Sequence, residues 1–127
     1  MVDAMQVSTF ATKSHDSPDE VRAPDKTRVE VVRLPGFTIG RFKLQPGWRW
    51  SECVKPVVGT DSCQARHVGV IQQGRLHVVH EDGSEGEAGP GEAYVIEPGH
   101  DAWVVGDEPA IVVDFQGMLD YARAQAD

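Results

Sequence analysis

Residues 61–103 decide the fold, and three pieces of this stretch carry the pattern. They read Asp61-Ser-Cys-Gln-Ala-Arg-His67, Ile71-Gln-Gln-Gly74 and Gly91-Glu-Ala-Tyr-Val-Ile-Glu-Pro-Gly-His-Asp-Ala-Trp103. One thiol and two imidazoles therefore stand among short apolar runs and glycine turns. The runs predict short strands with tight connections, and cysteine and histidine are residue types that bind transition metals.

The chain repeats this texture from Arg28 onward. Short β-rich runs alternate with Pro-Gly pairs and with the hairpin signal Asp82-Gly83, which is typical of an all-β sandwich or barrel. The expected strands cover residues 28–34, 37–44, 48–54, 64–72, 75–80, 85–88, 93–96, 102–105 and 110–115. The sequence therefore predicts an all-β fold.

The chain is expected to form one domain with an extension at each end. Its 127 residues, 40% of them hydrophobic, can bury a core without disulfides. Residues 1–27 are mostly small, polar or charged and predict a flexible or draped N-terminal arm. The β-barrel is expected over 28–117. Residues 118–127 form a tail, for which a short helix over Met118–Gln125 and frayed coil are the two alternatives.

Charge and composition narrow the partners. The 12 basic against 20 acidic residues give a formal charge of -8, which disfavours binding to nucleic acid or to an anionic membrane. No run approaches the ~20 apolar residues of a membrane span, and the simplest location is cytoplasmic. Cys53 and Cys63 are too few for a disulfide scaffold and are expected as thiols in a reducing compartment.

The turn framework resembles that of the cupin superfamily between Gly40 and Phe115. The glycines and prolines are similar to those of the two cupin motifs. The closest likeness is to a group of small single-domain cupins that carry Pro-Gly-Trp-Arg-Trp-Ser, here Pro46–Ser51, Val-Lys-Pro, here Val54–Pro56, and the string from Pro98 to Pro109. The resemblance implies a double-stranded β-helix, also called a jelly-roll barrel, with an internal pocket and a homodimeric state. It implies no particular activity.

The resemblance also implies where metal ligands would stand. Counting back from the glycine that ends the first motif, the family's glutamate position falls on His67, its second histidine on Cys63 and its first on Asp61. The last ligand position falls on Ala102, with His100 two residues earlier. Because that offset preserves strand parity, His100 is expected to face the barrel interior.

One thiolate and two imidazoles favour zinc, with iron, nickel and manganese as alternatives. Cys63, His67 and His100 are the first candidates and Asp61 is a weaker fourth. Residues four apart on a straight strand lie ~13 Å apart, so Cys63 and His67 can share an ion only if the chain bends between them. In the alternative interpretation, Cys63 is a small buried apolar residue and both histidines are hydrogen-bonded pocket residues.

Three tryptophans form a second candidate site. Trp48 and Trp50 share strand parity, and Trp103 follows the second motif, so these indoles are expected to stack a flat or apolar ligand. Packing in the core or in a dimer interface is the alternative. On the run 75–80, parity predicts His80 inward and His77 outward.

We therefore expect a cytoplasmic protein that binds a small molecule, with or without a divalent metal, as a sensor or ligand-binding module. The alternative is a metal-dependent enzyme, such as a dioxygenase, isomerase or lyase, acting on a small polar substrate through His67. A third hypothesis is an interaction module whose tryptophans form an oligomer interface. A polar, water-accessible pocket would favour turnover, and an apolar cavity would argue against it.

Overall fold

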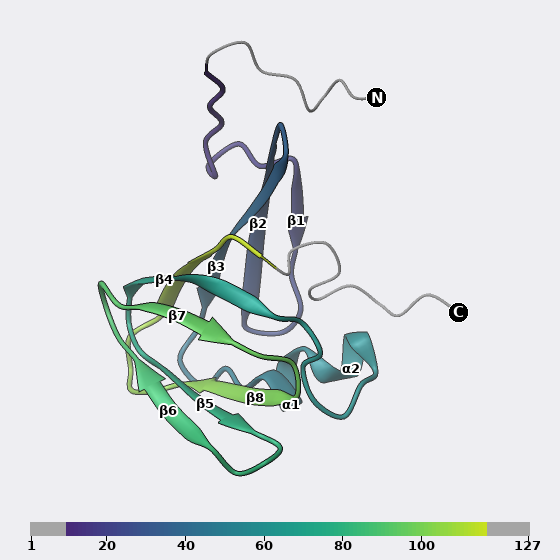
Figure 1. The fold of residues 1–127 in the computed structure, drawn as a ribbon, viewed down its shortest axis with the longest axis vertical. Coiled ribbons are helices and arrows are strands. Elements are labelled where there is room, and N and C mark those ends of the chain that lie inside the picture. Colours follow the sequence, from purple (N-terminus) through teal and green to yellow (C-terminus); the bar gives the residue numbers. More distant parts are fainter. Residues whose placement is uncertain (1–9, 117–127) are drawn as a thin grey trace.

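Two antiparallel sheets face each other in the computed structural model, which describes residues 10–116 (Figure 1). The six-stranded sheet has the order β1-β2-β3-β9-β4-β7, and the three-stranded sheet has the order β6-β5-β8. The strands are β1 Glu20–Arg22, β2 Thr27–Leu34, β3 Phe37–Leu44, β4 His67–Gln73, β5 Leu76–His80, β6 Glu85–Ala88, β7 Ala93–Ile96, β8 His100–Val104 and β9 Ala110–Asp114. The predicted all-β class is confirmed.

The core lies between the two sheets because side chains alternate along each strand. On β9 the alternation buries Ala110, Val112 and Asp114, and on β8 it buries His100 and Ala102. Valine, isoleucine and leucine fill most inner positions, so the barrel has an apolar interior. Asp114 and His100 are polar exceptions in this interior, and buried polar groups need hydrogen-bond partners. Both side chains line the same small space inside the barrel.

The segment 48–54 was expected as a strand, and that expectation was wrong. Only Arg49 makes a bridge, to Trp103, and two short helices follow: α1 Trp50–Cys53 and α2 Lys55–Val58. The Asp101 carboxylate accepts a hydrogen bond from the Ser51 backbone N–H at 3.0 Å and so satisfies one free donor at the start of α1.

The second helix has local start and stop signals. A proline lies in its first turn, where a missing N–H is harmless, and Gly59 ends it with a φ of 80°. Gly74, which ends the stretch that resembles the first cupin motif, also takes a conformation that favours glycine. Gly74 has a φ of 75°, and a Cβ atom there would lie 2.5 Å from the Pro109 carbonyl oxygen.

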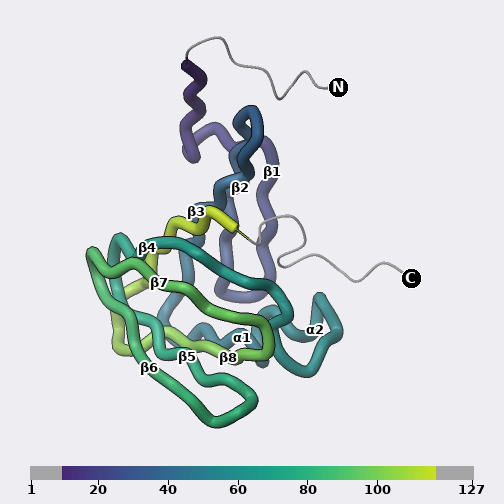
Figure 2. The backbone as a smooth tube through the Cα atoms, in the orientation of Figure 1, coloured from purple at the N-terminus to yellow at the C-terminus, as the bar shows by residue number. Residues whose placement is uncertain are grey.

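The described part of the expected arm adds an edge strand. β1 pairs with β2 through the register Val21 to Glu30, and Figure 2 shows β1 beside the β2–β3 hairpin, whose tip extends away from the barrel. The expected C-terminal helix over 118–125 lies outside the described residues, as do residues 1–9. Within residues 10–116, no helix has the length and apolarity needed to cross a membrane.

Candidate metal centre

Three buried side chains, Cys63, His67 and His100, meet inside the barrel. The Sγ atom of Cys63 lies 3.7 Å from Nε2 of His67, and one ligand atom from each residue lies within 4.8 Å of the other two. Each residue is at most 5% exposed. Ligands around a tetrahedral zinc ion stand about 3.5 Å apart, given bond lengths of about 2.0 to 2.3 Å. The donor types and their spacing therefore fit one zinc-sized ion.

A bend in the chain brings Cys63 and His67 together. Cys63 is not part of a continuous strand, because it pairs with His100 as an isolated bridge: its N–H donates to the His100 carbonyl at 2.8 Å and its carbonyl accepts from Gly99 at 2.7 Å. His67 then opens β4. The straight-strand separation of ~13 Å does not apply here, and residues from three segments converge.

Both histidines use the same ring nitrogen outside the cluster. His100 Nδ1 donates to the Glu97 carbonyl oxygen at 2.7 Å, and His67 Nδ1 lies 2.8 Å from the Asp114 carboxylate. Since these partners accept hydrogen bonds, Nδ1 of each ring carries a proton, and Nε2 is the nitrogen that faces the cluster and can bind a metal once it is deprotonated. Protein metal sites commonly fix their histidines in this way.

Asp114 is the central supporting residue. It is 1% exposed, and its carboxylate accepts hydrogen bonds from the Tyr94 hydroxyl at 3.1 Å and from the Gln116 backbone N–H at 2.9 Å, in addition to its contact with His67. Gly69 makes room for the tyrosine, because a Cβ atom there would lie 2.6 Å from the Tyr94 hydroxyl. Asp114 was not among the site residues predicted from the sequence, although it shares the inner face of β9 with Ala110.

The hydrogen bonds around Cys63 and His67 change the pKa values of both residues. Burial raises the pKa of the Cys63 thiol, but hydrogen bonds with His100 and His67 outweigh burial and lower this pKa to about 6. Burial lowers the pKa of His67, but Asp114 and Cys63 outweigh it and raise this pKa to about 9. At neutral pH the metal-free protein thus holds a thiolate beside an imidazolium. The thiolate is the form that binds metal, and binding would release the His67 proton.

Comparison with known proteins agrees with this geometry at the level of the fold. No protein family and no curated protein sequence matches the chain. A structure of unknown function from Rhizobium leguminosarum bv. viciae 3841 is similar, with a TM-score of 0.62, 23% identity, and coverage of 85% of this chain and 96% of that one. KdgF from Halomonas sp. has a TM-score of 0.57 at 21% identity, covering 85% and 93%. A cupin-superfamily sugar phosphate isomerase from Silicibacter pomeroyi has a TM-score of 0.60 at 18% identity, covering 84% and 75%.

The chain has the cupin fold. Within this barrel the fourth expected ligand, Asp61, does not join the cluster, because its side chain is fully exposed and lies 3.9 Å from Lys55 Nζ. Ala102, at the family's last ligand position, is buried and shares the inner face of β8 with His100. The offset of two residues therefore leaves a histidine inside the cupin barrel.

The tryptophans do not gather at one pocket of the cupin barrel. Trp48 and Trp50 are 3% and 2% exposed and line a space of about 40 Å³ beside the centre, little more than the ≈ 30 Å³ that a water molecule occupies. Trp103 packs elsewhere. Its ring stacks on His77 with 4.7 Å between centroids, and the Arg49 guanidinium carbon lies 4.1 Å from its centroid.

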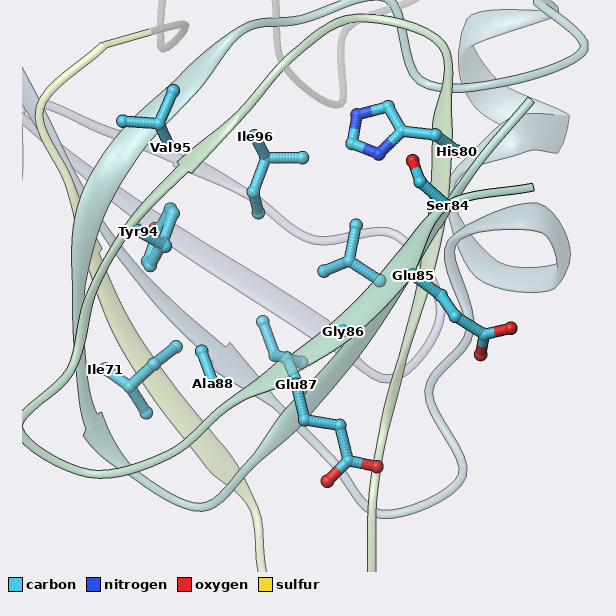
Figure 3. Close-up of a pocket in the computed structure, with 12 residues that line it drawn as sticks. Ile71, His80, Ser84, Glu85, Gly86, Glu87, Ala88, Tyr94, Val95 and Ile96 are labelled. Carbon is cyan, nitrogen blue, oxygen red and sulfur yellow. The ribbon is translucent and has the colours of Figure 1, made fainter. Parts of the chain in front are cut away.

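A larger cavity of about 300 Å³ lies next to the centre and is bordered by β5, β6 and β7 (Figure 3). It shares Leu76, Tyr94 and Ile96 with the small space beside His67 and His100. His80 lies at this cavity, 5.8 Å from His100 between ring centroids, whereas His77 bonds to carboxylates on the outer face. The predicted orientations of His80 and His77 are confirmed.

Proposed function

We propose that this cupin binds one divalent metal ion through Cys63 Sγ and Nε2 of His67 and His100, and that it binds a small molecule in the adjoining cavity as a sensor or ligand-binding module. The observation that carries the proposal is the convergence of three buried donor atoms within 4.8 Å, each on a separately anchored residue. Zinc is the favoured ion because sulfur and nitrogen ligands suit it.

Each residue of the centre would have a distinct role in holding the ion. Cys63 supplies a negative charge that offsets part of the ion's charge, and the histidines supply neutral nitrogen donors. Asp114 holds the Nδ1 proton of His67, and Tyr94 fixes the carboxylate. A bound ion would supply Lewis-acid chemistry with a coordination position left for water or a ligand.

Metal binding is tested with chelator-stripped protein. Zinc should bind in a ratio of one per chain and raise the melting temperature, since a ligand that binds only the folded state at about 100 times its Kd adds about 2.7 kcal/mol of stability. Cobalt(II) should give the absorption of a thiolate-bound ion. Cys63→Ser should abolish that absorption, and Cys53→Ser, which changes the other buried thiol, should keep it.

The proposal would be wrong if zinc, nickel, iron and manganese all left the melting temperature unchanged and elemental analysis found no metal in the purified protein. A cobalt spectrum that survives Cys63→Ser would instead remove the cysteine from the ligand set. The same titration on His77→Gln provides a second control, because His77 lies on the outer face of the barrel.

A metal-dependent enzyme, such as a dioxygenase, isomerase or lyase, is the second candidate. Three protein ligands leave room for a substrate, and the similar protein from Silicibacter pomeroyi is described as a sugar phosphate isomerase. The mainly apolar lining of the neighbouring cavity favours binding over turnover of a polar substrate. If a substrate is found, His67→Ala should abolish its conversion while the protein stays folded.

A homodimer remains a proposal from the resemblance. An interaction surface built on Trp48 and Trp50 lacks support, because both side chains are buried within a single chain. Light scattering of the purified protein would measure the oligomeric state.

A further inference from the structure

The larger cavity exists because one strand places almost no side chain in it. The inner positions of β6 are Gly86 and Ala88, while Glu85 and Glu87 point away and bond to His77 on the outer face at 2.6 and 3.0 Å (Figure 3). A Cβ atom on Gly86 would meet nothing within 4 Å. Gly86 does not have a positive φ, so its backbone does not require glycine. The empty volume is therefore a property of these side chains.

The remaining wall of the cavity is mainly apolar. Ile71, Leu76, Val78 and Ile96 line it from three strands. A polyol that entered would exchange hydrogen bonds with water for contacts with hydrocarbon, which costs free energy for each unpaired hydroxyl. A cavity of about 150 Å³ accommodates benzene, so about 300 Å³ suits a substituted aromatic ring or a short branched chain.

The His80 ring and the Ser84 hydroxyl lie at one end of this cavity (Figure 3). His80 Nε2 donates to the Glu97 carbonyl oxygen at 3.1 Å, so Nδ1 is the ring nitrogen left to accept a hydrogen bond. That atom has no hydrogen-bond partner among residues 10–116. The ring is also anchored to the same carbonyl as the metal-ligand candidate His100, so both histidines are fixed relative to each other.

We propose that the ligand of this cavity is a small molecule with an apolar, ring-sized body and one hydroxyl group, whose proton His80 Nδ1 accepts. The body packs on Leu76, Val78 and Ile96. This inference rests on the ligand-binding half of the proposed function and narrows it to a class that excludes sugars and other polyols.

The test uses 4-propylphenol, propylbenzene and glucose as probes on zinc-free and zinc-loaded protein. Titration calorimetry and the methyl resonances of the lining residues report binding. 4-Propylphenol should bind roughly three- to tenfold more tightly than propylbenzene, because one hydrogen bond is worth about 0.5 to 1.5 kcal/mol. Glucose should not bind. Binding of glucose without the aromatic probes would overturn the proposal.

Variants of the lining residues test whether the probe binds in this cavity. Gly86→Leu should weaken 4-propylphenol binding more than tenfold by filling the space, and Gly86→Ala should weaken it less. Val78→Phe fills the same space from β5 and serves if the leucine variant does not fold. His80→Phe keeps a ring of similar size and should remove the difference between 4-propylphenol and propylbenzene. Unchanged affinity in both filling variants would overturn the assignment.

The two proposals fail separately. Zinc binding that is normal in wild type and in Gly86→Leu, together with no binding of any aromatic probe, would reject this ligand class and leave the metal centre standing. Aromatic probes that bind and respond to Gly86→Leu in a protein that takes up no metal would support the ligand class and reject the metal centre.

Discussion

Two histidine–carboxylate pairs differ mainly in burial. His67 lies 2.8 Å from Asp114, and these side chains are 6% and 2% exposed. His77 lies 2.6 Å from Glu85 and 3.0 Å from Glu87, whose side chains are 58% and 39% exposed. Exposed pairs are screened by water and contribute little. A buried pair cannot exchange its partners for water, so losing one member leaves an uncompensated group.

Distance alone therefore does not identify a functional histidine. The nitrogen–oxygen distances in the outer pair are similar to the distance in the inner pair, but the carboxylates of the outer pair face solvent and the His77 ring stacks on Trp103. In the inner pair, Nε2 of His67 faces the Cys63 sulfur at 3.7 Å, and the ring lines a space that it shares with His100. The four predictions below compare the two pairs or parts of the inner one.

The largest expected effect separates His67→Gln from His77→Gln. The first change removes a ligand atom and should abolish tight zinc binding, whereas the second should leave it unchanged. Competition with a chromophoric chelator measures both affinities. Equal losses in the two variants would mean that the metal does not bind inside the barrel.

Asp114→Ala and Glu87→Ala test the carboxylates in the same way. Loss of Asp114 should lower zinc affinity by roughly 10- to 100-fold, because such partners orient the ligand histidine. It should also destabilise the metal-free protein by about 3 to 5 kcal/mol, since it leaves a buried charge unpaired. Urea unfolding and chelator competition measure these effects. Glu87→Ala should change neither quantity measurably.

Sequence patterns predicted the barrel well, because alternation and glycine turns are local signals of strands. They also predicted the inward orientation of His100 and His80, which depends only on parity. The strand predicted over residues 48–54 was wrong because Asp101, which is distant in sequence, helps to start a helix there. Nearby strand-like residue types could not reveal that contact.

The candidate site could be predicted only in part. Cys63, His67 and His100 could be proposed from spacing, but the bend that brings the first two together depends on a bridge to a distant strand. Asp61 was expected to share a strand face with Cys63 and His67, but the chain before Cys63 is not a strand, so alternation does not apply to it. Asp114 was missed since an aspartate at a strand end also suits a turn.

The third prediction concerns pH in the metal-free protein. The pKa of His67 is raised to about 9, so its contribution to stability is present below 6.5 and is lost as pH rises through 9. The pKa of Cys63 is lowered to about 6, so its contribution is present above 9.0 and is lost as pH falls through 6. Between 6.5 and 9 these slopes are opposite, and stability should be nearly independent of pH.

Cys63→Ser should reveal the pH dependence of stability that comes from His67 alone. With the thiol gone, Asp114 still raises the pKa of His67, so the free energy of unfolding should fall by about 1 to 2 kcal/mol between neutral pH and pH 9. Cys53→Ser is the matched control and should keep the flat profile. Urea unfolding at several pH values decides this. A steep wild-type profile would contradict the paired titration.

The smallest effect is expected for Tyr94→Phe, which removes only the hydroxyl that bonds to Asp114 at 3.1 Å. The ring can stay in the space that Gly69 leaves open, so the loss should be about 1 kcal/mol of stability. A double-mutant cycle with Asp114→Asn separates two roles of the tyrosine. If it acts by fixing the carboxylate, its effects on stability and zinc affinity should shrink in the Asp114→Asn background, whereas additive effects would show that its ring packing matters instead.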